Sequence, residues 1–263
     1  MVGWAARHSA PAAGPLARVW LFLLLLGLPL KRRLAPGLAL PARLRLDGET
    51  RRFWFRDASE LFAIEDIFGA GEYDVVADAD PRVIVDLGSN SGQAALWFRQ
   101  RFPEARILCV EPDPRTFATL RRNLGHDSHV KLLNVAVTAA DGPVTLAREP
   151  GSSWGTRVGA GDGPEVSGLS LESILAREEI AGVDLLKVDI EGHEHDVLAN
   201  SPALSRTALV VGELHPELLS VTADVAVEDM RVCGQFRRAG LDGHIFVLTR
   251  DLNVGIGTDR RVG

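Results

Sequence analysis

Short apolar runs alternate with segments of helical periodicity between residues 81 and 248. The first run, residues 83–85, reads Val-Ile-Val, which is typical of a parallel strand covered on both faces. Strands that alternate with helices indicate a doubly wound α/β fold, so we predict a mostly parallel, Rossmann-like sheet. Further strands are expected at residues 107–110, 130–137, 184–190, 208–214 and 245–248, and helices at residues 94–102, 117–124, 169–180, 196–200 and 225–239.

A small cap is expected before this sheet. Leu-Arg-Leu at residues 44–46 and Arg-Phe-Trp-Phe at residues 52–55 flank Asp47-Gly48-Glu49, and this pattern indicates a hairpin. Apolar side chains recur at helical spacing in residues 60–68, which predicts a helix. We therefore divide the chain into a leader at residues 1–43, a cap formed by a hairpin and a helix at residues 44–80, and a main domain at residues 81–263.

The leader differs in charge from the rest of the chain. Residues 1–56 hold ten Lys and Arg and two Asp and Glu, a net charge of +8, which leaves −14 for the remainder of a chain whose net charge is −6. An acidic main domain argues against a general nucleic-acid binder. The two cysteines are too few for a disulfide framework or a multi-cysteine zinc site.

Residues 19–30 form an apolar run that precedes Lys31, Arg32 and Arg33. The run is shorter than the roughly 18 apolar residues that span a bilayer, and no small-residue cleavage site of a secretory signal follows it. Two interpretations stay open. Residues 19–33 lie in a membrane interface with the basic cluster on anionic headgroups, or they form a terminal helix packed on the main domain or an extension from an upstream start codon. Residues 1–18 are expected to be disordered. We predict a cytoplasmic protein, with or without this peripheral membrane contact. The sequence does not indicate an oligomeric state.

A glycine-containing turn follows the first predicted strand. It reads Asp-Leu-Gly-Ser-Asn-Ser-Gly over residues 86–92. Ligands of open α/β sheets bind beyond the carboxyl ends of the strands, and glycines there let the backbone turn sharply and approach a ligand. The spacing of Gly88 and Gly92 differs from the Gly-x-Gly-x-x-Gly of dinucleotide enzymes, and no Lys follows as in a phosphate loop, so a pyrophosphate is not favoured. A tight turn without a ligand is the alternative.

An acidic residue, Glu111, follows the second predicted strand and precedes Pro112 and Asp113. A carboxylate a little over 20 residues beyond the first turn can accept hydrogen bonds from ribose hydroxyls. The alternative is an acidic residue solvated at a strand end. Together with the glycine turn, Glu111 favours a nucleoside ligand that lacks phosphates.

The sequence resembles the S-adenosylmethionine site of class I methyltransferases at residues 83–93 (Val-Ile-Val-Asp-Leu-Gly-Ser-Asn-Ser-Gly-Gln) and residues 110–114 (Val-Glu-Pro-Asp-Pro). More narrowly, Leu-Lys-Val-Asp-Ile-Glu-Gly-His-Glu-His-Asp-Val-Leu at residues 186–198 resembles the signature of the FkbM-type methyltransferase family. That family is known mainly for O-methylation of sugars, polyketides and other secondary metabolites. Residues 67–73, 134–137 and 211–216 also resemble family segments, and the likeness covers roughly residues 44–248.

The resemblance implies S-adenosylmethionine as the methyl donor and a hydroxyl of a small molecule or glycan as the acceptor. It implies that Glu111 holds the ribose, with Asp113 near it, and that Asn134 lies near the adenine. Around the methionine part of the cofactor it implies Asp86, Gly88, Ser89, Asn90 and Gly92.

A hydroxyl acceptor must lose its proton, so we expect a base near the transferred methyl group. Period-2 alternation places Lys187, Asp189 and Glu191 on one face of the fourth predicted strand. Glu213 and His215 share a face at the end of the fifth, so Asp189, Glu191, Glu213 and His215 are expected to converge beside the cofactor as the catalytic group. For Lys187 a structural role, locking its strand to the next helix, stays open. Carboxylates and His can hold Mg²⁺ or a transition ion, but the sequence shows no tight metal-ligand spacing and we predict no metal.

Two other function classes stay open beside the methyltransferase. A nicotinamide-dependent oxidoreductase would use the same fold with the other glycine spacing. A non-catalytic, membrane-associated module would retain the fold without turnover. Residues 148–167, rich in Gly and Ser, are expected to form a loop, and nothing in them identifies the acceptor.

Overall fold

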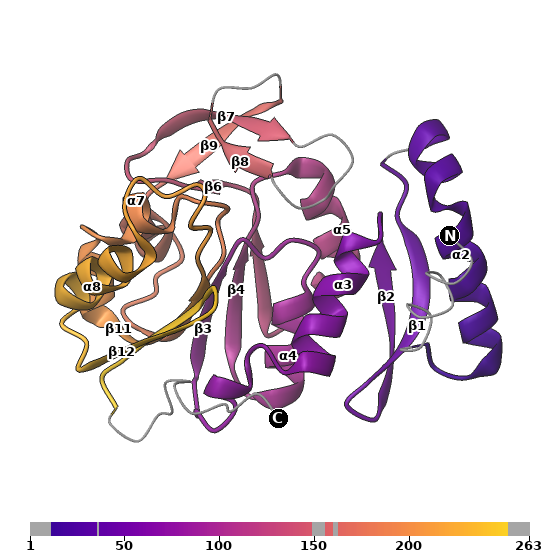
Figure 1. Ribbon diagram of the computed structural model, residues 1–263, viewed down its shortest axis with the longest axis horizontal. Coiled ribbons are helices and arrows are strands. Elements are labelled where there is room, and N and C mark those ends of the chain that lie inside the picture. Colours follow the sequence, from indigo (N-terminus) through magenta and orange to yellow (C-terminus); the bar gives the residue numbers. More distant parts are fainter. Residues whose placement is uncertain (1–11, 36, 149–155, 160–162, 252–263) are drawn as a thin grey trace.

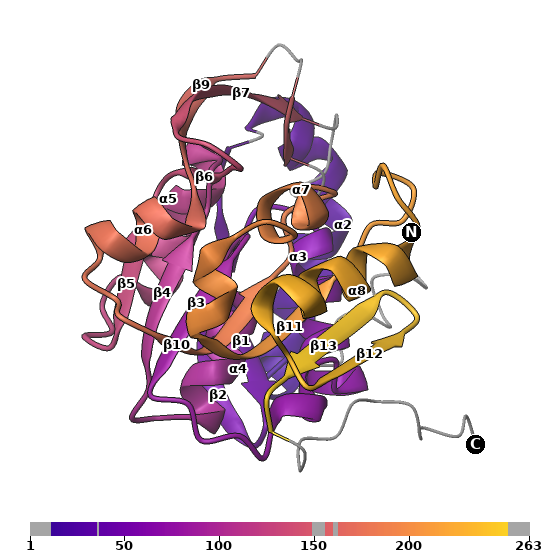
Figure 2. The same ribbon diagram turned by 90° about the vertical axis from the view of Figure 1, so that its left-hand side faces the viewer.

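The computed structural model describes residues 12–35, 37–148, 156–159 and 163–251. A seven-stranded sheet occupies the centre of the molecule, with helices on both faces and a smaller, four-stranded sheet over one end (Figure 1 and Figure 2). The strand order in the central sheet is β12-β13-β11-β10-β3-β4-β5. These strands are β3 (Val83–Leu87), β4 (Arg106–Val110), β5 (Val130–Leu133), β10 (Val183–Val188), β11 (Thr207–Glu213), β12 (Arg238–Asp242) and β13 (Ile245–Thr249).

The strand order reverses next to β3. The chain moves outward from β3 through β4 and β5, all parallel, and then returns to place β10 on the other side of β3, followed by the parallel β11. The last strand, β13, lies antiparallel between β11 and β12. The predicted doubly wound, mostly parallel sheet is therefore confirmed, and the reversal between β3 and β10 is the switch point at which such sheets bind ligands.

The central sheet is covered on both faces. Ile84 and Val85 of β3 belong to cores on opposite sides, and Leu185 and Leu186 of β10 divide in the same way. Because both faces are buried, the parallel strands are mostly apolar and do not alternate regularly between apolar and polar residues, although Asp86 of β3 and Lys187 of β10 are buried with them. Helices α3 (Ser59–Glu65), α4 (Gln93–Arg101) and α5 (Pro114–Leu124) cover one face, and α6 (Leu171–Arg177), α7 (Glu194–Leu198) and α8 (Ala223–Gly234) cover the other (Figure 1).

The cap contains the expected hairpin and helix. Strands β1 (Leu40–Leu46) and β2 (Glu49–Phe55) pair around Asp47 and Gly48, and α3 continues into a π-helical turn, η1 (Asp66–Ala70). A buried polar network joins the cap to the main domain. Arg56 donates from Nε to Glu60 Oε1 at 3.1 Å and from Nη2 to the hydroxyl of Thr116 on α5 at 2.8 Å.

Residues 15–34 of the leader form one helix, α2 (Pro15–Leu34), which lies beside β1 at the edge of the molecule (Figure 1). The expectation of disorder through residue 18 is therefore wrong for residues 15–18. The helix is held because Leu21, Leu25 and Leu28, spaced three or four residues apart, are buried in the core of the cap. Among the described residues, no helix is long and apolar enough to cross a membrane.

Two of the predicted elements end at least four residues earlier than expected. The strand predicted at residues 130–137 ends at Leu133, because the amide of Asn134 turns back to the carbonyls of the loop after β4. The helix predicted at residues 225–239 ends at Gly234, because Gln235 adopts a left-handed φ of 56°, and β12 follows.

The predicted loop at residues 148–167 contains strands where the structure describes it. β6 (Ala136–Val137), β7 (Gly142–Arg148), β8 (Thr156–Val158) and β9 (Glu165–Leu169) form the four-stranded sheet, in the order β6-β9-β7-β8. Residues 149–155 and 160–162 lie outside the described part of the chain. Pairing with β7 decides the structure of β8 and β9, and a window of Gly and Ser does not reveal that pairing.

Candidate active site

A cavity of about 780 Å³ lies at the carboxyl ends of the parallel strands. Its wall is formed by the segments after β3, β4, β10 and β11, by β8 of the small sheet, and by the end of the cap. This is the switch point of the sheet, and the volume is in the range of small-molecule sites.

The glycine turn after β3 forms one side of the cavity through Gly88, Ser89 and Asn90. Gly88 has a φ of +75°, and a Cβ there would lie 1.7 Å from the carbonyl oxygen of Asp189, so only glycine allows the two loops to meet. Asn90 is also left-handed, with a φ of 49°, and its buried Oδ1 has no hydrogen-bond partner among the described residues. A buried acceptor without a partner on a cavity wall suits a ligand that donates a hydrogen bond.

Glu111, after β4, forms the neighbouring part of the wall. Its Oε2 accepts a hydrogen bond from the backbone N–H of Asn90 at 3.0 Å, and its Oε1 accepts one from the N–H of Asp113 at 2.8 Å. The carboxylate therefore joins the two loops in which sequence analysis located a nucleoside site. Burial raises the pKa of Glu111 to about 8, and the two N–H donors oppose that rise.

Three other residues expected at the cofactor do not line the cavity. Gly92, with a φ of +99°, precedes α4, where a Cβ would collide with leucine side chains of α5. Asp113 caps α5 by accepting a hydrogen bond from the N–H of Arg115 at 2.8 Å. Asn134 donates to two carbonyls of the loop after β4 at 2.7 and 3.0 Å. These side chains shape the loops of the site from outside the cavity.

Asp86 also lies off the cavity wall, completely buried in the sheet next to Lys187. Lys187 Nζ is 3.2 Å from Asp86 Oδ1 and 3.6 Å from Asp189 Oδ2, and it donates to the carbonyl of Gly88 at 2.9 Å. Burial opposes the charge on Lys187, but the attraction of the two carboxylates outweighs it and raises the pKa of Lys187. Lys187 therefore ties β10 to β3 and the glycine turn, whereas the sequence suggested a link to the next helix.

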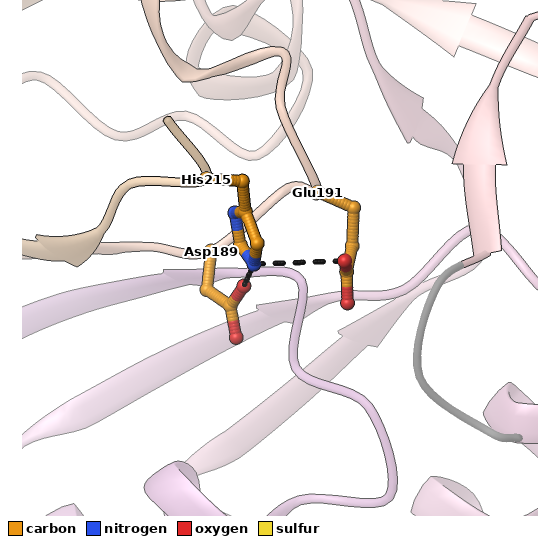
Figure 3. Close-up of side chains that lie close together, drawn as sticks. All are labelled: Asp189, Glu191 and His215. Carbon is orange, nitrogen blue, oxygen red and sulfur yellow. Dashed lines mark ion pairs between the residues drawn. The ribbon is translucent and has the colours of Figure 1, made fainter. Parts of the chain in front are cut away.

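The four residues expected to act in catalysis, Asp189, Glu191, Glu213 and His215, all line the cavity. Asp189 and Glu191 are not on a strand as predicted, because β10 ends at Val188 and Glu191 adopts a left-handed φ of 56°. Figure 3 shows His215 between the two carboxylates: its Nε2 is 3.8 Å from Asp189 Oδ1 and 3.6 Å from Glu191 Oε2. Their catalytic roles stay a prediction.

The second nitrogen of His215 contacts a residue that sequence analysis did not select. Nδ1 lies 3.2 Å from Oε1 of the buried Glu194, at the start of α7. Burial disfavours the charged ring, but Glu194 and then Asp189 favour it and raise the pKa of His215 to about 9. Burial, and next the charge of Asp189, raises the pKa of Glu213 to about 7. Glu194 lies between His193 and His195 in the sequence, and its side chain is completely buried.

The cap and the small sheet also contribute to the cavity wall. Glu72 and Tyr73 line it from the cap, and burial raises the pKa of both side chains. Arg157 of β8 lines the opposite side, and His193 Nε2 lies 2.8 Å from the carbonyl oxygen of Val158, which ties the small sheet to the turn after β10. Neither Glu72 nor Arg157 was selected as a site residue from the sequence.

The family model for the methyltransferase FkbM domain matches residues 86–231, which are more than half of the chain. The match includes the segments after β3, β4, β10 and β11 that line the cavity. The chain belongs to the FkbM methyltransferase family. Two curated relatives carry names that describe their reactions. The 2-O-methyltransferase NoeI of Sinorhizobium fredii is 30% identical over 154 residues, which are 51% of this chain and 63% of NoeI. The hexuronic acid methyltransferase AglP of Haloferax volcanii is 26% identical over 226 residues, which are 82% of this chain and 88% of AglP.

This FkbM methyltransferase chain thus spans less than two thirds of NoeI but most of AglP. Solved structures are more distant. Cofactor-bound Rv0187 from MTB is 15% identical, with 74% of this chain and 89% of that chain covered at a TM-score of 0.42. The O-methyltransferase from Bacillus cereus in complex with SAH is 14% identical, with 69% and 81% covered at a TM-score of 0.39.

Proposed function

We propose that this FkbM-family chain transfers a methyl group from S-adenosylmethionine to a hydroxyl of a sugar or glycan. The observation that carries the proposal is the cavity, which brings the glycine turn, the buried Glu111 and the four residues of the catalytic group together at the switch point of the sheet. The name of NoeI supports methylation of an oxygen, and the name of AglP supports a hexuronic acid as the acceptor.

The wall of the cavity fits the donor in two ways. Glu111 offers a carboxylate that two backbone N–H groups hold in place and that can accept hydrogen bonds from ribose hydroxyls, and Asn90 offers an acceptor without a partner among the described residues. When bound, S-adenosylmethionine supplies an electrophilic methyl group whose carbon–sulfur bond breaks as the acceptor oxygen attacks, and the sulfur keeps the electron pair. The residues of the chain position the acceptor, exclude water and take up its proton.

Glu213 is the side chain that we propose as the proton acceptor. It lines the cavity at the end of β11, and among the described residues its carboxylate has no hydrogen bond or ion pair. Asp189, by contrast, is close to Lys187 and His215. The hydroxyl proton passes to Glu213 while the new carbon–oxygen bond forms, and Asp189, Glu191 and His215 contact the acceptor.

Calorimetric titration with S-adenosylhomocysteine tests the donor site. We expect the wild-type chain to bind it and NAD to give no heat. A hydrogen bond to a charged group contributes about 1.5–3 kcal/mol, so loss of at least one such bond to the ribose in Glu111→Ala should weaken binding at least about tenfold. Glu213→Gln should bind S-adenosylhomocysteine like the wild type. Unchanged affinity in Glu111→Ala, or binding of NAD in its place, would refute the donor assignment.

Methyl transfer to a panel of neutral sugars and hexuronic acids, followed by mass spectrometry, tests the reaction itself. Glu213→Gln should lower the turnover about 10²- to 10⁴-fold, the usual contribution of a general base. A wild-type chain that binds the donor product but methylates no sugar hydroxyl would contradict the proposed acceptor class. Wild-type turnover in Glu213→Gln would exclude Glu213 as the base.

We also propose that α2 contacts an anionic membrane surface. Its outer face is apolar, and its large side chains lie within about 100° of the helix circumference, opposite the buried leucines. The net charge of +8 in residues 1–56, with the exposed Arg33 in the last turn of α2, complements anionic headgroups. The residues of this face are Leu16, Val19, Trp20, Leu23, Leu30 and Leu34, which are 50–85% exposed.

Cosedimentation with vesicles of phosphatidylcholine and phosphatidylserine tests this contact. The wild-type chain should sediment with them and remain in solution with phosphatidylcholine alone, and Leu23→Glu should not sediment. Val232→Glu, on the exposed apolar surface of α8, is the matched control and should behave like the wild type. Equal sedimentation of Leu23→Glu and the wild type, or dimerisation through this face, would refute the proposal.

A further inference from the structure

Three metal-ligating side chains meet in the cavity. One ligand atom from each of Asp189, Glu191 and His215 lies within 4.8 Å of the other two, and the side chains are 16–29% exposed, so a small ligand can reach them (Figure 3). Sequence analysis predicted no metal because the three residues have no metal-ligand spacing along the chain. Linear spacing does not reveal this acid–His cluster, because its members come from the segments after two neighbouring strands, β10 and β11.

One buried carboxylate orients the whole acid–His cluster. Oε1 of Glu194 accepts hydrogen bonds from the backbone N–H groups of Ile190 and Gly192 at 3.0 and 3.1 Å, and it lies 3.2 Å from Nδ1 of His215. When the ring is neutral, this contact places its hydrogen on Nδ1 and leaves the lone pair of Nε2 toward Asp189 and Glu191. A histidine that binds a metal shows this pattern, with its outer N–H on a carboxylate.

The backbone around the acid–His cluster is built to hold one shape. Glu191 and Gly192 have φ values of 56° and 93°. A Cβ on Gly192 would lie 2.4 Å from Cβ of Leu218, so the turn that carries Asp189 and Glu191 packs tightly against the segment after His215. A strained turn fixed by close packing is typical of a functional site. Here it fixes the position of Asp189 and Glu191 relative to His215.

The charges of the cavity favour a cation at this position. Seven carboxylates line the cavity, and the only Lys and Arg side chains on the wall, as far as the structure describes it, are Lys187 and Arg157. Lys187 forms ion pairs with both Asp86 and Asp189. It contacts Oδ2 of Asp189, whereas His215 contacts Oδ1. The seven carboxylates belong to Asp66, Glu72, Glu111, Asp189, Glu191, Glu213 and Glu217.

We propose that Asp189, Glu191 and His215 bind a divalent cation of the Mn²⁺ type, with Glu194 as the outer partner of His215. One imidazole nitrogen and two carboxylate oxygens suit such an ion, and three protein ligands leave positions open for the acceptor. Ligand atoms about 2.1 Å from an ion lie roughly 3.0–3.4 Å apart, so the three side chains, now 3.6 and 3.8 Å apart across His215 and all within 4.8 Å of one another, must rotate closer to bind it.

The next part of the inference rests on the proposed function and gives the cation a role in it. An ion in the acid–His cluster coordinates the acceptor hydroxyl and lowers its pKa. The proton passes to Glu213, the oxygen bonds the methyl carbon, and the sulfur of the donor retains the electrons of the broken bond. Asp189, Glu191 and His215 are then ligands of the ion, and Glu213 is the base.

Binding of Mn²⁺ alone tests the site without donor or acceptor. The full chain is treated with EDTA, exchanged into buffer and titrated with MnCl₂, with free Mn²⁺ followed by electron paramagnetic resonance. We expect one Mn²⁺ per chain. Glu191→Gln and His215→Ala should weaken binding at least about tenfold, and Glu194→Gln, which leaves all three ligands in place, should weaken it by about 10- to 100-fold.

His195→Ala provides the matched control. His195 also pairs with a carboxylate, with Nε2 2.9 Å from Asp229 Oδ2, but it belongs to no group of three ligands among the described residues. This variant should bind Mn²⁺ like the wild type. Absence of Mn²⁺ binding by the wild type, or equal binding by Glu191→Gln, which is nearly isosteric, would overturn the inference.

A parallel titration separates the cation from the methyltransferase function. If S-adenosylhomocysteine binds in EDTA and methyl transfer in EDTA is as fast as with Mn²⁺, the proposed function holds and the role of the cation in it is refuted. If Mn²⁺ binds as described but S-adenosylhomocysteine does not, the metal site holds and the proposed function is refuted. Loss of methyl transfer in EDTA with recovery on addition of Mn²⁺ supports both.

Discussion

The buried pair of Lys187 and Asp86 offers the sharpest test of how this site is held together. The two residues face each other on neighbouring strands, their side chains are 3% and 0% exposed, and Nζ lies 3.2 Å from Oδ1. Replacing Lys187 by Met keeps most of the side-chain volume but leaves the carboxylate of Asp86 buried without its cation. Breaking a buried ion pair by removing one partner costs about 3–5 kcal/mol.

This loss is large enough to measure by thermal unfolding. At about 2–4 °C per kcal/mol for a chain of this size, Lys187→Met should lower the Tm by roughly 6–20 °C. The exposed Arg51, paired with the exposed Glu49 on the hairpin, provides the matched control, because Arg51→Met should cost less than about 1 kcal/mol.

A double-mutant cycle then identifies the cause. Asp86→Asn combined with Lys187→Met removes both charges, so the double variant should recover at least about 2 kcal/mol relative to the sum of the single changes. A cost for Lys187→Met no larger than that for Arg51→Met, or additive effects in the cycle, would show that this pair does not lock β3 to β10.

Two further predictions concern the glycine turn and the cap. Gly88→Ala places a Cβ 1.7 Å from the carbonyl oxygen of Asp189 and should abolish binding of S-adenosylhomocysteine in calorimetry, whereas Gly243→Ala, also at positive φ but with open space around it, should bind normally. Burial raises the pKa of Glu60 to about 7, so the folded state holds this proton more tightly than the unfolded state, and its contribution to stability is complete below pH 4.5 and decreases as the pH rises to 7. Urea unfolding should therefore show that the stability of Glu60→Gln relative to the wild type increases by about 3 kcal/mol between pH 4.5 and 8, and a constant difference would contradict the pKa.

The sequence predicted the parallel strands of the central sheet better than it predicted the strands and the helix at the edges of the fold. Mostly apolar strands are visible in a short window of sequence, because most side chains of a strand buried on both faces must be apolar. β8 and β12 were missed, since each depends on a partner strand that lies elsewhere in the sequence. Helix α2 was expected only as one of two interpretations, because its packing on β1 is a tertiary contact.

The candidate site likewise contains residues that the sequence could identify and contacts that it could not reveal. Gly88, Glu111, Asp189 and His215 could be selected from the sequence because each lies at or just after the end of a predicted strand, and all parallel strands end at the same edge of the sheet. The contact between His215 and Glu194 could not, because it joins two segments 21 residues apart through the packing of α7.

The order of strands and helices along the chain was enough to determine the fold class and the edge at which polar side chains gather, since hydrophobic periodicity is a local property. Tertiary structure decided which of those side chains meet. Asp86, Gly92, Asp113 and Asn134 face the interior of the sheet or the loops, while Asp189, Glu191 and His215 share one corner of the cavity. The direction of a side chain at the end of a strand depends on the turn that follows and on what packs against it, and those contacts come from distant parts of the chain.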